Sequence, residues 1–254
     1  MSRELAMARK SGPRQLKRES APRSWRLHRK ELTWAPSPRP GGHPRQVSVP
    51  LVILLRELLG HARTSREAER IVERSMVKVD GKIRRDHRFS VGLMDVVNIS
   101  GVGKAYRMLP RPRRGLSPIQ IEERESAYKI CRITGRETLS SGRVQLALHD
   151  GRTLIIPGKE QSQRPEEGYR LGGAVQISLP SQKIMKYIPF NVGSLGLVTN
   201  GRNEGRHGRI TTISPGTSAR RRIARIETQD QIFETPAEYV LPVGTEAALV
   251  SLEK

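Results

Sequence analysis

The fold of this chain is decided by one stretch, SVPLVILLRELLGHARTSREAERIVERSMVKVDGKIRRDHRFSVGLMDVVNI (residues 48–99). A predicted first helix has apolar residues on nearly every side and should therefore be mostly buried: Leu51, Val52, Ile53, Leu54, Leu55, Leu58 and Leu59. Ser48 is the predicted N-cap of this helix, and Gly60 is its predicted end. Thr64 and Glu67 have the spacing of a capping box, which predicts that a second helix begins there.

A β-hairpin is predicted directly after the second helix, because Asp80-Gly81 favours a type I′ turn between two short strands. The apolar positions Val77, Val79 and Ile83 alternate with Lys78, Lys82 and Arg84. Since alternate residues of a strand face opposite sides, the cations should lie on the outer side of the hairpin. Another strand, LMDVVNI, follows and completes a small α+β module.

Cations of the second helix and of the hairpin could converge on one surface. Fixed cations on rigid elements suit a phosphate backbone and need no catalytic group. The alternative is a small α+β core with a solvated basic face.

These residues resemble the RNA-binding motif shared by small-subunit ribosomal protein S-four, some pseudouridine synthases and tyrosyl-tRNA synthetases. The similarity lies in the capped helix and in MVKVDGKIRRD…VGLMDVVNI. In that family the helix pair and the hairpin loop hold RNA. The resemblance therefore implies RNA contacts by Arg63, Thr64, Ser65, Arg66, Lys78, Lys82 and Arg84.

The composition points to a polyanion as the partner. Among 254 residues, 46 Lys and Arg against 25 Asp and Glu give a net charge of +21. No apolar run approaches the roughly 18 residues of a membrane-spanning helix, and there is no apolar signal-peptide core, so we expect a cytoplasmic protein. Cys131 is the single cysteine, which excludes disulfides within the chain and cysteine-based zinc sites. The six histidines show no metal-ligand spacing, and we expect no cofactor.

Residues 1–47 form a predicted basic, Pro-rich arm that cannot bury enough surface to fold alone. It carries twelve Lys or Arg against three Glu, and Trp25 and Trp34 could stack on RNA or serve as anchors. The alternative is a flexible solubilising tail. The arm cations that we expect to contact RNA are Arg14, Lys17, Arg18, Arg23, Arg26, Arg39 and Arg45.

Residues 111–190 are predicted to form a small β domain. A basic linker, PRPRRG (residues 110–115), is predicted at its start, and the strands follow from residue 116 onward. Its predicted strands cover residues 127–133, 144–148, 152–156, 174–179 and 183–189. We find no catalytic set there: Asp150 and Glu137 are interpreted as turn and surface residues, and Cys131 as a small buried residue in a strand.

The last segment, residues 191–254, contains NVGSLGLVTNGRNEGRHGRITTI. Two predicted strands flank NGRNEGRHG, whose glycines would permit a positive φ and close approach of a ligand. The alternative is an ordinary hairpin loop. The stretch resembles the KOW motif of ribosomal proteins and NusG-type transcription factors, which forms part of a small SH3-like barrel. The resemblance implies contacts by Arg202, Asn203, Arg206, His207 and Arg209, and the later basic tract adds Arg220, Arg221 and Arg222.

Taken together, the modules resemble the archaeal and eukaryotic (e-type) S-four family of the small ribosomal subunit. LKRESAPRSW, WAPSPRPGGHP and HDGRTLIIP also fit that family. The expected fold is multidomain and mainly β with a small α+β module. Its four parts are an extended basic N-terminal arm (1–47), an S-four-like (αL) RNA-binding domain (48–110), a central small β domain (111–190) and a C-terminal SH3-like KOW barrel (191–254).

The family resemblance implies a structural constituent of the small ribosomal subunit that binds ribosomal RNA, has neighbouring ribosomal proteins as partners and supports translation. It implies no enzymatic activity, small-molecule substrate, membrane or homo-oligomer. One alternative is an RNA-modifying enzyme of pseudouridine synthase type, but we find no Arg-Leu-Asp-type context and too few residues for its catalytic domain. Another is a KOW-type transcription factor, which would leave the S-four motif unexplained.

Overall fold

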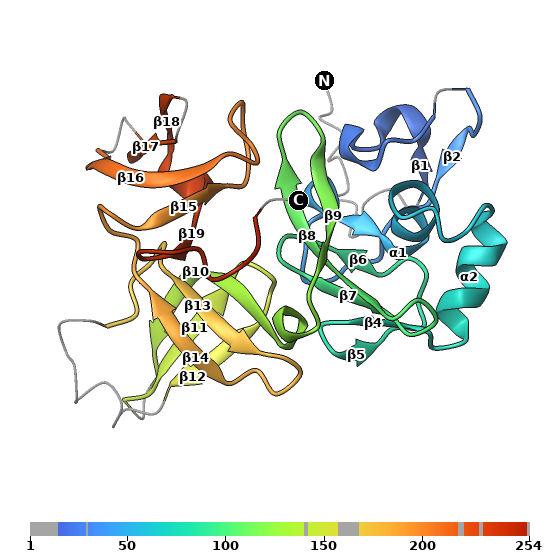
Figure 1. Ribbon diagram of the computed structural model, residues 1–254, viewed down its shortest axis with the longest axis horizontal. Coiled ribbons are helices and arrows are strands. Elements are labelled where there is room, and N and C mark those ends of the chain that lie inside the picture. The colour runs from blue at the N-terminus through green and yellow to red at the C-terminus, as the bar shows by residue number, and fades with distance from the viewer. Residues whose placement is uncertain are drawn as a thin grey trace, which may run out of the picture.

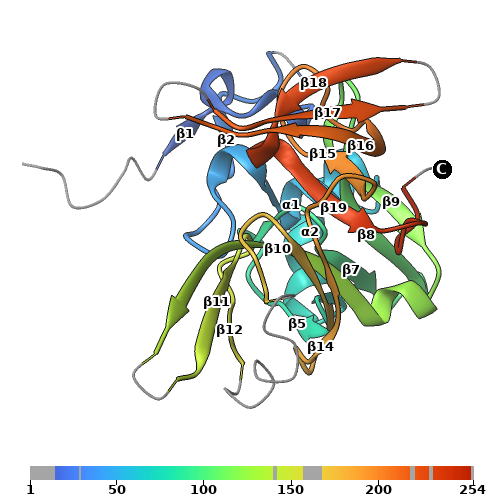
Figure 2. The same ribbon diagram turned by 90° about the vertical axis from the view of Figure 1, so that its left-hand side faces the viewer.

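The computed structural model describes residues 15–28, 30–139, 142–156, 168–217, 221–228 and 231–252. Three five-stranded antiparallel sheets and few helices make up the fold, so the mainly β fold class is confirmed. Helices α1 (Leu51–Ile53) and α2 (Ser65–Glu73) lie with the first sheet in one half of the molecule, and the other two sheets form the second half (Figure 1). In the perpendicular view the C-terminal sheet, formed by strands within residues 195–244, lies above the central sheet, formed by strands within residues 128–188 (Figure 2).

The first module packs its helices on a sheet of order β5–β4–β7–β8–β9. The strands of this module are β3 (Val49–Pro50), β4 (Val77–Val79), β5 (Lys82–Ile83), β6 (Ser90–Val91), β7 (Val96–Ile99), β8 (Lys104–Arg111) and β9 (Gly115–Ile121), with β3 paired to β6. Helix α1 continues as a π-helix over Leu54–Leu58. Residues 51–55 of this helix are buried, as its all-round apolar pattern predicts.

The first helix begins later than the sequence predicts. Ser48 is not its N-cap, because the hydroxyl of Ser48 donates to the carbonyl of Pro44 and Pro50 occupies the capping position. Gly60 does follow the helix end, with φ +68°. Thr64 caps α2 as predicted, since its hydroxyl accepts from the amide of Glu67 at 3.2 Å.

The hairpin between β4 and β5 has the predicted type I′ turn. Asp80 and Gly81 have φ values of 51° and 76°, and Val79 pairs with Lys82 across a two-residue loop. The turn does not project into solvent, however. Asp80 is buried, and a Cβ at Gly81 would lie 3.2 Å from Pro180 of the central module. The turn therefore docks on the neighbouring module.

The prediction of a basic linker at residues 110–115 is wrong. Strands β8 and β9 pair along their whole length, from Ala105 opposite Ile121 to Arg111 opposite Gly115. Residues 112–114 are the turn of this hairpin, so the first sheet runs past the predicted domain boundary to Ile121. Three arginines and two prolines within six residues resembled a linker because turn residues and linker residues have similar compositions.

The described part of the arm packs on the first module. Strands β1 (Leu16–Lys17) and β2 (Trp34–Ala35) pair, and 3₁₀ turns cover Arg18–Ser20, Arg23–Trp25 and Arg45–Val47. Trp25 is fully buried in the core of that module, and its indole nitrogen donates to the carbonyl of Ser48 at 2.7 Å. Of the two roles considered for the tryptophans, Trp25 therefore has the role of an anchor, and this one large aromatic side chain supplies apolar burial that the arm lacks by itself.

The central module contains the predicted strands with shifts of a few residues at most, except that β10 is longer at its end. Its sheet has the order β12–β11–β10–β13–β14. The strands are β10 (Tyr128–Thr138), β11 (Val144–Leu148), β12 (Thr153–Ile156), β13 (Ala174–Ser178) and β14 (Ile184–Ile188), and a 3₁₀ turn at Arg124–Ala127 precedes them. Cys131 is buried in β10, as interpreted from the sequence.

The C-terminal sheet has the order β18–β17–β16–β15–β19. It is formed by β15 (Leu195–Val198), β16 (His207–Ser214), β17 (Ile223–Glu227), β18 (Ile232–Pro236) and β19 (Val240–Gly244), with a 3₁₀ turn at Ala237–Tyr239. Strands β15 and β16 flank the KOW-like loop, with Leu197 opposite His207. Gly208 lies within β16 and not at a positive φ, contrary to the interpretation of this loop. A Cβ at Gly208 would lie 2.2 Å from the carbonyl oxygen of Glu227.

A buried charged cluster joins the first module, the arm and the central module. The ammonium group of Lys129 is fully buried and pairs with the carboxylates of Asp80, Asp95 and Asp150. Its Nζ lies 3.1 Å from Asp80 and 2.9 Å from Asp150. His43 of the arm reaches Asp95 at 3.2 Å. Asp150 is thus a buried junction residue as well as a turn residue.

Candidate nucleic-acid interface

The arm presents most of its predicted RNA-binding cations to solvent. Lys17, Arg23, Arg26, Arg39 and Arg45 are exposed. The anchor Trp25 and the pairing of β1 with β2 hold the backbone near Lys17, Arg23 and Arg26. Arg39 forms an ion pair with Asp86 at 3.2 Å, which leaves it partly neutralised. The side chain of Arg18 is turned back to the carbonyls of Leu27 and His28, and Arg14 lies outside the described residues.

Helix α2 places a second group of predicted residues at its N-terminus. Arg63, Thr64 and Arg66 are exposed there, where the helix dipole favours anions, and the carboxylate of Glu67 already accepts from the amide of Arg63 at 2.8 Å. Ser65 is half-buried, and its hydroxyl accepts from Arg56 at 2.5 Å. Arg56 also pairs with Glu57 at 2.7 Å. Ser65 thus has a partner within the protein, and the exposed atoms of this site belong mainly to its neighbours.

The β4–β5 hairpin keeps two of its three cations on the outside. Lys78 and Lys82 are exposed, as the alternation of residues predicts. Arg84 differs, because its guanidinium lies over the ring of Phe89, 4.3 Å from the ring centre, and lines a cavity of about 250 Å³ beside Asp80 and Lys129. The structure therefore places Arg84 at the inner junction and not beside Arg63 and Arg66.

The KOW-like loop presents Arg202, while Asn203, Arg206 and His207 are half-buried. The guanidinium of Arg206 lies 5.7 Å from the ring centre of Phe233, a cation–π distance that fixes it against the C-terminal sheet. Arg209 and Arg222 are exposed.

Two cations of the C-terminal basic tract have partners in the protein, and the third is not described. Arg222 lies over the ring of Phe190 at 5.3 Å, and Arg221 forms an ion pair with Glu238. Arg220 lies outside the described residues. Arg222 is therefore a better candidate for an RNA contact than Arg221, whose charge is already partly balanced.

Gly205 approaches protein and not solvent. It has φ +81°, and a Cβ there would lie 2.6 Å from the backbone carbon of Arg111 and 2.6 Å from the ring of Pro112. The KOW-like loop therefore rests on the tip of the β8–β9 hairpin. Gly205 is therefore required by this contact between modules. The sequence had instead suggested that the glycines of the loop permit close approach of a ligand.

We predict that Gly205→Ala separates this loop from the hairpin. The substitution adds strain at a positive φ and a contact of 2.6 Å, which together should cost about 2–3 kcal/mol and increase amide exchange in residues 199–206. Gly201→Ala is the matched control, since Gly201 has φ +88° but its added Cβ would lie an ordinary 3.5 Å from Tyr239. Equal exchange and equal melting in both variants would contradict the proposed contact.

Sequence reasoning missed the arginines of the β8–β9 turn. Arg113 and Arg114 are exposed, and Gly115 lies so close to the arm that a Cβ there would be 2.7 Å from that of Ser24. The hairpin therefore places Arg113 and Arg114 beside the arm cations. The available signal was the alternation of apolar residues on both sides of PRR, which is typical of a hairpin.

The buried cluster around Lys129 was also missed, and its electrostatics point to a structural role. Burial acts to lower the pKa of Lys129, but Asp95 and Asp80 outweigh it and hold that pKa well above its usual value. Burial acts to raise the pKa of Asp150, yet Lys129 lowers it to about 2. Burial, followed by Asp95, raises the pKa of Asp80. An ammonium enclosed in this way stays protonated and has no route to act as a base.

The described residues contain no group of three or more His, Cys, Asp or Glu that is placed to hold a metal ion. Within the same residues, no helix is long and apolar enough to cross a membrane. One α+β module and two β modules, with exposed cations on an arm, at a capped helix and on a glycine-rich loop, are typical of the class of basic RNA-binding proteins.

Comparisons with known proteins identify the family. The model of the ribosomal family S4e matches residues 102–184, and that of the RS4NT (NUC023) domain matches residues 10–46. Small ribosomal subunit protein eS4 of Ignicoccus hospitalis is 45% identical over 95% of both chains, and that of Desulfurococcus amylolyticus is 40% identical over 97% of this chain and 98% of its own. This chain belongs to the eS4 family of small ribosomal subunit proteins.

A solved structure agrees with this assignment. The crystal structure of the 30S ribosomal protein S4e from Thermoplasma acidophilum superposes with a TM-score of 0.65 at 28% identity, covering 78% of this chain and 95% of that one. The predicted resemblance to the e-type S-four family is therefore confirmed.

Proposed function

We propose that this protein is a structural constituent of the small ribosomal subunit, where it binds ribosomal RNA and supports translation. The observation that carries this proposal is the 45% identity to an eS4 protein over nearly the whole chain. Its site of action is the cytoplasm, where the small subunits of these organisms are found. The family is one of ribosomal structural proteins, so the two alternatives, an RNA-modifying enzyme and a KOW-type transcription factor, have no support.

The architecture that fits this role has an S-four-like RNA-binding unit at residues 48–121 and an SH3-like KOW unit at residues 191–252. Two observations support the assignment of these units. The first unit combines a capped helix with a type I′ hairpin, and the second carries a glycine-rich loop between its first two strands. The partners we propose are small-subunit ribosomal RNA and neighbouring ribosomal proteins. A single copy per subunit would need no homo-oligomer and no small-molecule substrate.

Sedimentation tests this function directly. A tagged full-length protein, expressed in a related archaeon, should sediment with small subunits in a sucrose gradient and remain with them at moderate salt. Protein found only with RNA polymerase or at the top of the gradient would contradict the proposal.

We propose Arg63, Arg66, Lys78 and Lys82 as phosphate contacts, because all four are exposed on rigid elements. Replacing all four by Ala should leave the melting temperature nearly unchanged, since exposed substitutions usually stay within about 0.5 kcal/mol each. Four exposed charge contacts of about 0.5–1 kcal/mol each should lower RNA affinity by about 30- to 1,000-fold. Because each contact releases counterions, the slope of log K against log salt should fall by about 3 to 4.

The matched control removes the same charge elsewhere, through Ala at the exposed residues Lys104, Arg124, Arg136 and Lys186. Filter binding to a transcript of small-subunit ribosomal RNA at several salt concentrations measures both variants. Equal losses in the two variants would mean that net charge alone, and not the proposed surface, governs binding.

A further inference from the structure

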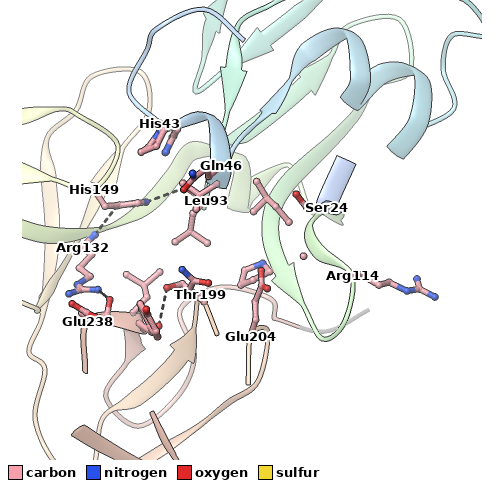
Figure 3. A pocket seen from close by; sticks show the side chains of 18 of the residues that line it. Ser24, His43, Gln46, Leu93, Arg114, Arg132, His149, Thr199, Glu204 and Glu238 are labelled. Carbon is pink, nitrogen blue, oxygen red and sulfur yellow. Dashed lines mark hydrogen bonds between the residues drawn. The ribbon is translucent and has the colours of Figure 1, made fainter. Parts of the chain in front are cut away.

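A cavity of about 620 Å³ lies where the arm, the β8–β9 hairpin, the central module and the C-terminal module meet. Figure 3 shows His43 and Gln46 on one side, Thr199 and Glu238 on the opposite side and the hairpin with Arg114 at the outer edge. Ligand pockets in proteins have volumes of roughly 300–1,000 Å³. The space would hold about 20 water molecules, at roughly 30 Å³ each.

The outer edge of this cavity is crowded with cations. Arg23 of the arm and Arg113 and Arg114 of the hairpin line it, and the side chain of Arg114 extends outward from the hairpin (Figure 3). Arg26 lies close by: burial lowers its pKa, and the neighbouring charges of Arg114 and Arg111 lower it further. Like charges repel, so folding gathers these guanidiniums at a cost that a bound polyanion would offset.

The walls of the cavity are suited to a flat ring. Leu93 and Tyr239 provide apolar surface, and the imidazole of His149 is neutral, because burial lowers its pKa to about 4. His149 accepts from the amide of Arg132 at 3.1 Å through Nδ1 and lies 3.3 Å from the carbonyl of Leu93 through Nε2. These two contacts fix both the tautomer and the orientation of the ring.

Polar groups are also available inside the cavity. Asn200 and Gln46 line it, and the Nε atom of Arg132 is buried without a hydrogen-bond partner. Of the two carboxylates on the wall, Glu238 is paired with Arg221, and burial raises the pKa of Glu204. The ion pair with Arg221 therefore reduces the negative charge that Glu238 presents to an anionic ligand.

We propose that this cavity receives one nucleotide splayed out of the ribosomal RNA, with its base inside and its phosphates along Arg23, Arg113 and Arg114. Unstacked bases are the usual target of sequence-specific RNA recognition, and they are held by aromatic stacking and by polar contacts to base edges. The inference rests on the proposed function, because it presupposes that the chain binds ribosomal RNA.

The arrangement favours RNA over a protein segment or a free metabolite. Three arginines line the cavity together with the apolar surface of Leu93 and Tyr239, which offers an extruded nucleotide contacts for both its phosphates and its base. A peptide would leave the gathered guanidiniums without partners. A small uncharged metabolite would not need three cations along the cavity, and these come from two segments about 90 residues apart in the sequence.

The test fills the cavity without removing any charge. Gln46 is exposed at the cavity wall, so Gln46→Trp should place an indole in the space that the base would occupy. Gln120→Trp is the matched control, since Gln120 is exposed on β9 and does not line the cavity. Affinity of the full-length proteins for a small-subunit ribosomal RNA transcript is measured by filter binding, and folding is checked by melting temperature.

We expect Gln46→Trp to weaken binding by about tenfold or more, because one stacked base contributes about that much, while Gln120→Trp binds like the unmodified protein. Equal affinity of the two variants would overturn the cavity proposal and leave the proposed function intact. Failure of the unmodified protein to bind the transcript would instead overturn the proposed function.

Photocrosslinking gives a second, independent measurement. Ultraviolet irradiation of purified small subunits, followed by mass spectrometry, should attach a nucleotide to the peptide that contains His149 or to the one that contains Tyr239. Crosslinks from these peptides to a ribosomal protein, or crosslinks confined to the arm and helix α2, would overturn the proposal.

Discussion

Lys129→Met should lower the free energy of unfolding by about 3–5 kcal/mol, which corresponds to a fall of about 6–20 °C in melting temperature. The side chain of Lys129 is fully buried among Asp80, Asp95 and Asp150. Methionine matches its length but removes the only ammonium group of the cluster. Arg152 remains, 3.2 Å from Asp150, but the three carboxylates would be left under-compensated in a dry site. Thermal melting followed by circular dichroism measures the effect.

The pH dependence of the melting temperature tests whether Lys129 stabilises the fold by compensating the charge of the buried carboxylates. In the unmodified protein the pKa of Asp150 is lowered to about 2, so its contribution to stability is present above the unfolded pKa of about 3.9 and is lost as pH falls towards 2. In Lys129→Met the buried carboxylates lose their counterion and their pKa values rise, so their repulsion is relieved on acidification. The difference in melting temperature between the two proteins should therefore be smaller at pH 4.5 than at pH 7.5.

Lys78→Met is the control for this prediction, because Lys78 is exposed on β4 and the substitution is chemically identical. It should melt within about 2 °C of the unmodified protein. A Lys129→Met variant that melts like Lys78→Met, or one whose deficit is the same at both pH values, would show that the cluster does not hold the modules together electrostatically.

Trp25→Ala should also cost about 3–5 kcal/mol, because it deletes a fully buried indole and leaves a cavity in the core of the first module. The substitution also leaves the carbonyl of Ser48 without its donor. Since Trp25 anchors the arm, residues 15–47 should detach before the rest unfolds. Limited trypsin digestion should then cleave at Arg23 and Arg26 at least tenfold faster than in the unmodified protein.

Trp34→Ala separates anchoring from RNA contact. Trp34 is 52% exposed, so its loss should change the stability by less than about 1 kcal/mol and leave the trypsin pattern unchanged. If Trp34 stacks on RNA, its loss should still weaken binding. The opposite result, with rapid cleavage in Trp34→Ala and slow cleavage in Trp25→Ala, would show that Trp34 and not Trp25 anchors the arm.

The local sequence pattern correctly predicted those elements whose structure depends on residues close to one another in the chain. Thr64 caps α2 and Asp80-Gly81 forms a type I′ turn, because each depends on backbone groups within four residues. The alternation of apolar residues also located β11 exactly and β13 within one residue. The charge of +21 and the order of the motifs identified the family that the comparisons then confirmed.

At two places the composition of a segment does not predict its structure. PRPRRG has the residues of a linker, yet it ends β8 and turns into β9, because the pairing of two long strands outweighs the local preference for an open loop. The arm has too few apolar residues to fold alone, yet Trp25 inserts into a core that other residues have already formed. Counting the apolar residues of one segment cannot predict that the segment packs into a core formed by other segments.

The sequence by itself determined the capped helix, the type I′ turn, the strands of the central module and the family, since these follow from periodicity, turn chemistry and the order of the motifs. Its net charge pointed to a polyanion as the partner. The tertiary structure alone decided which charges are available to RNA. Lys129 and Arg84 resemble the other cations in the sequence, but the first is enclosed by three aspartates and the second packs on Phe89. It also gathered Arg23 and Arg114 at one cavity across about 90 residues. The physical reason is that burial and electrostatic pairing depend on distances in space, which contacts between modules set and local sequence does not encode.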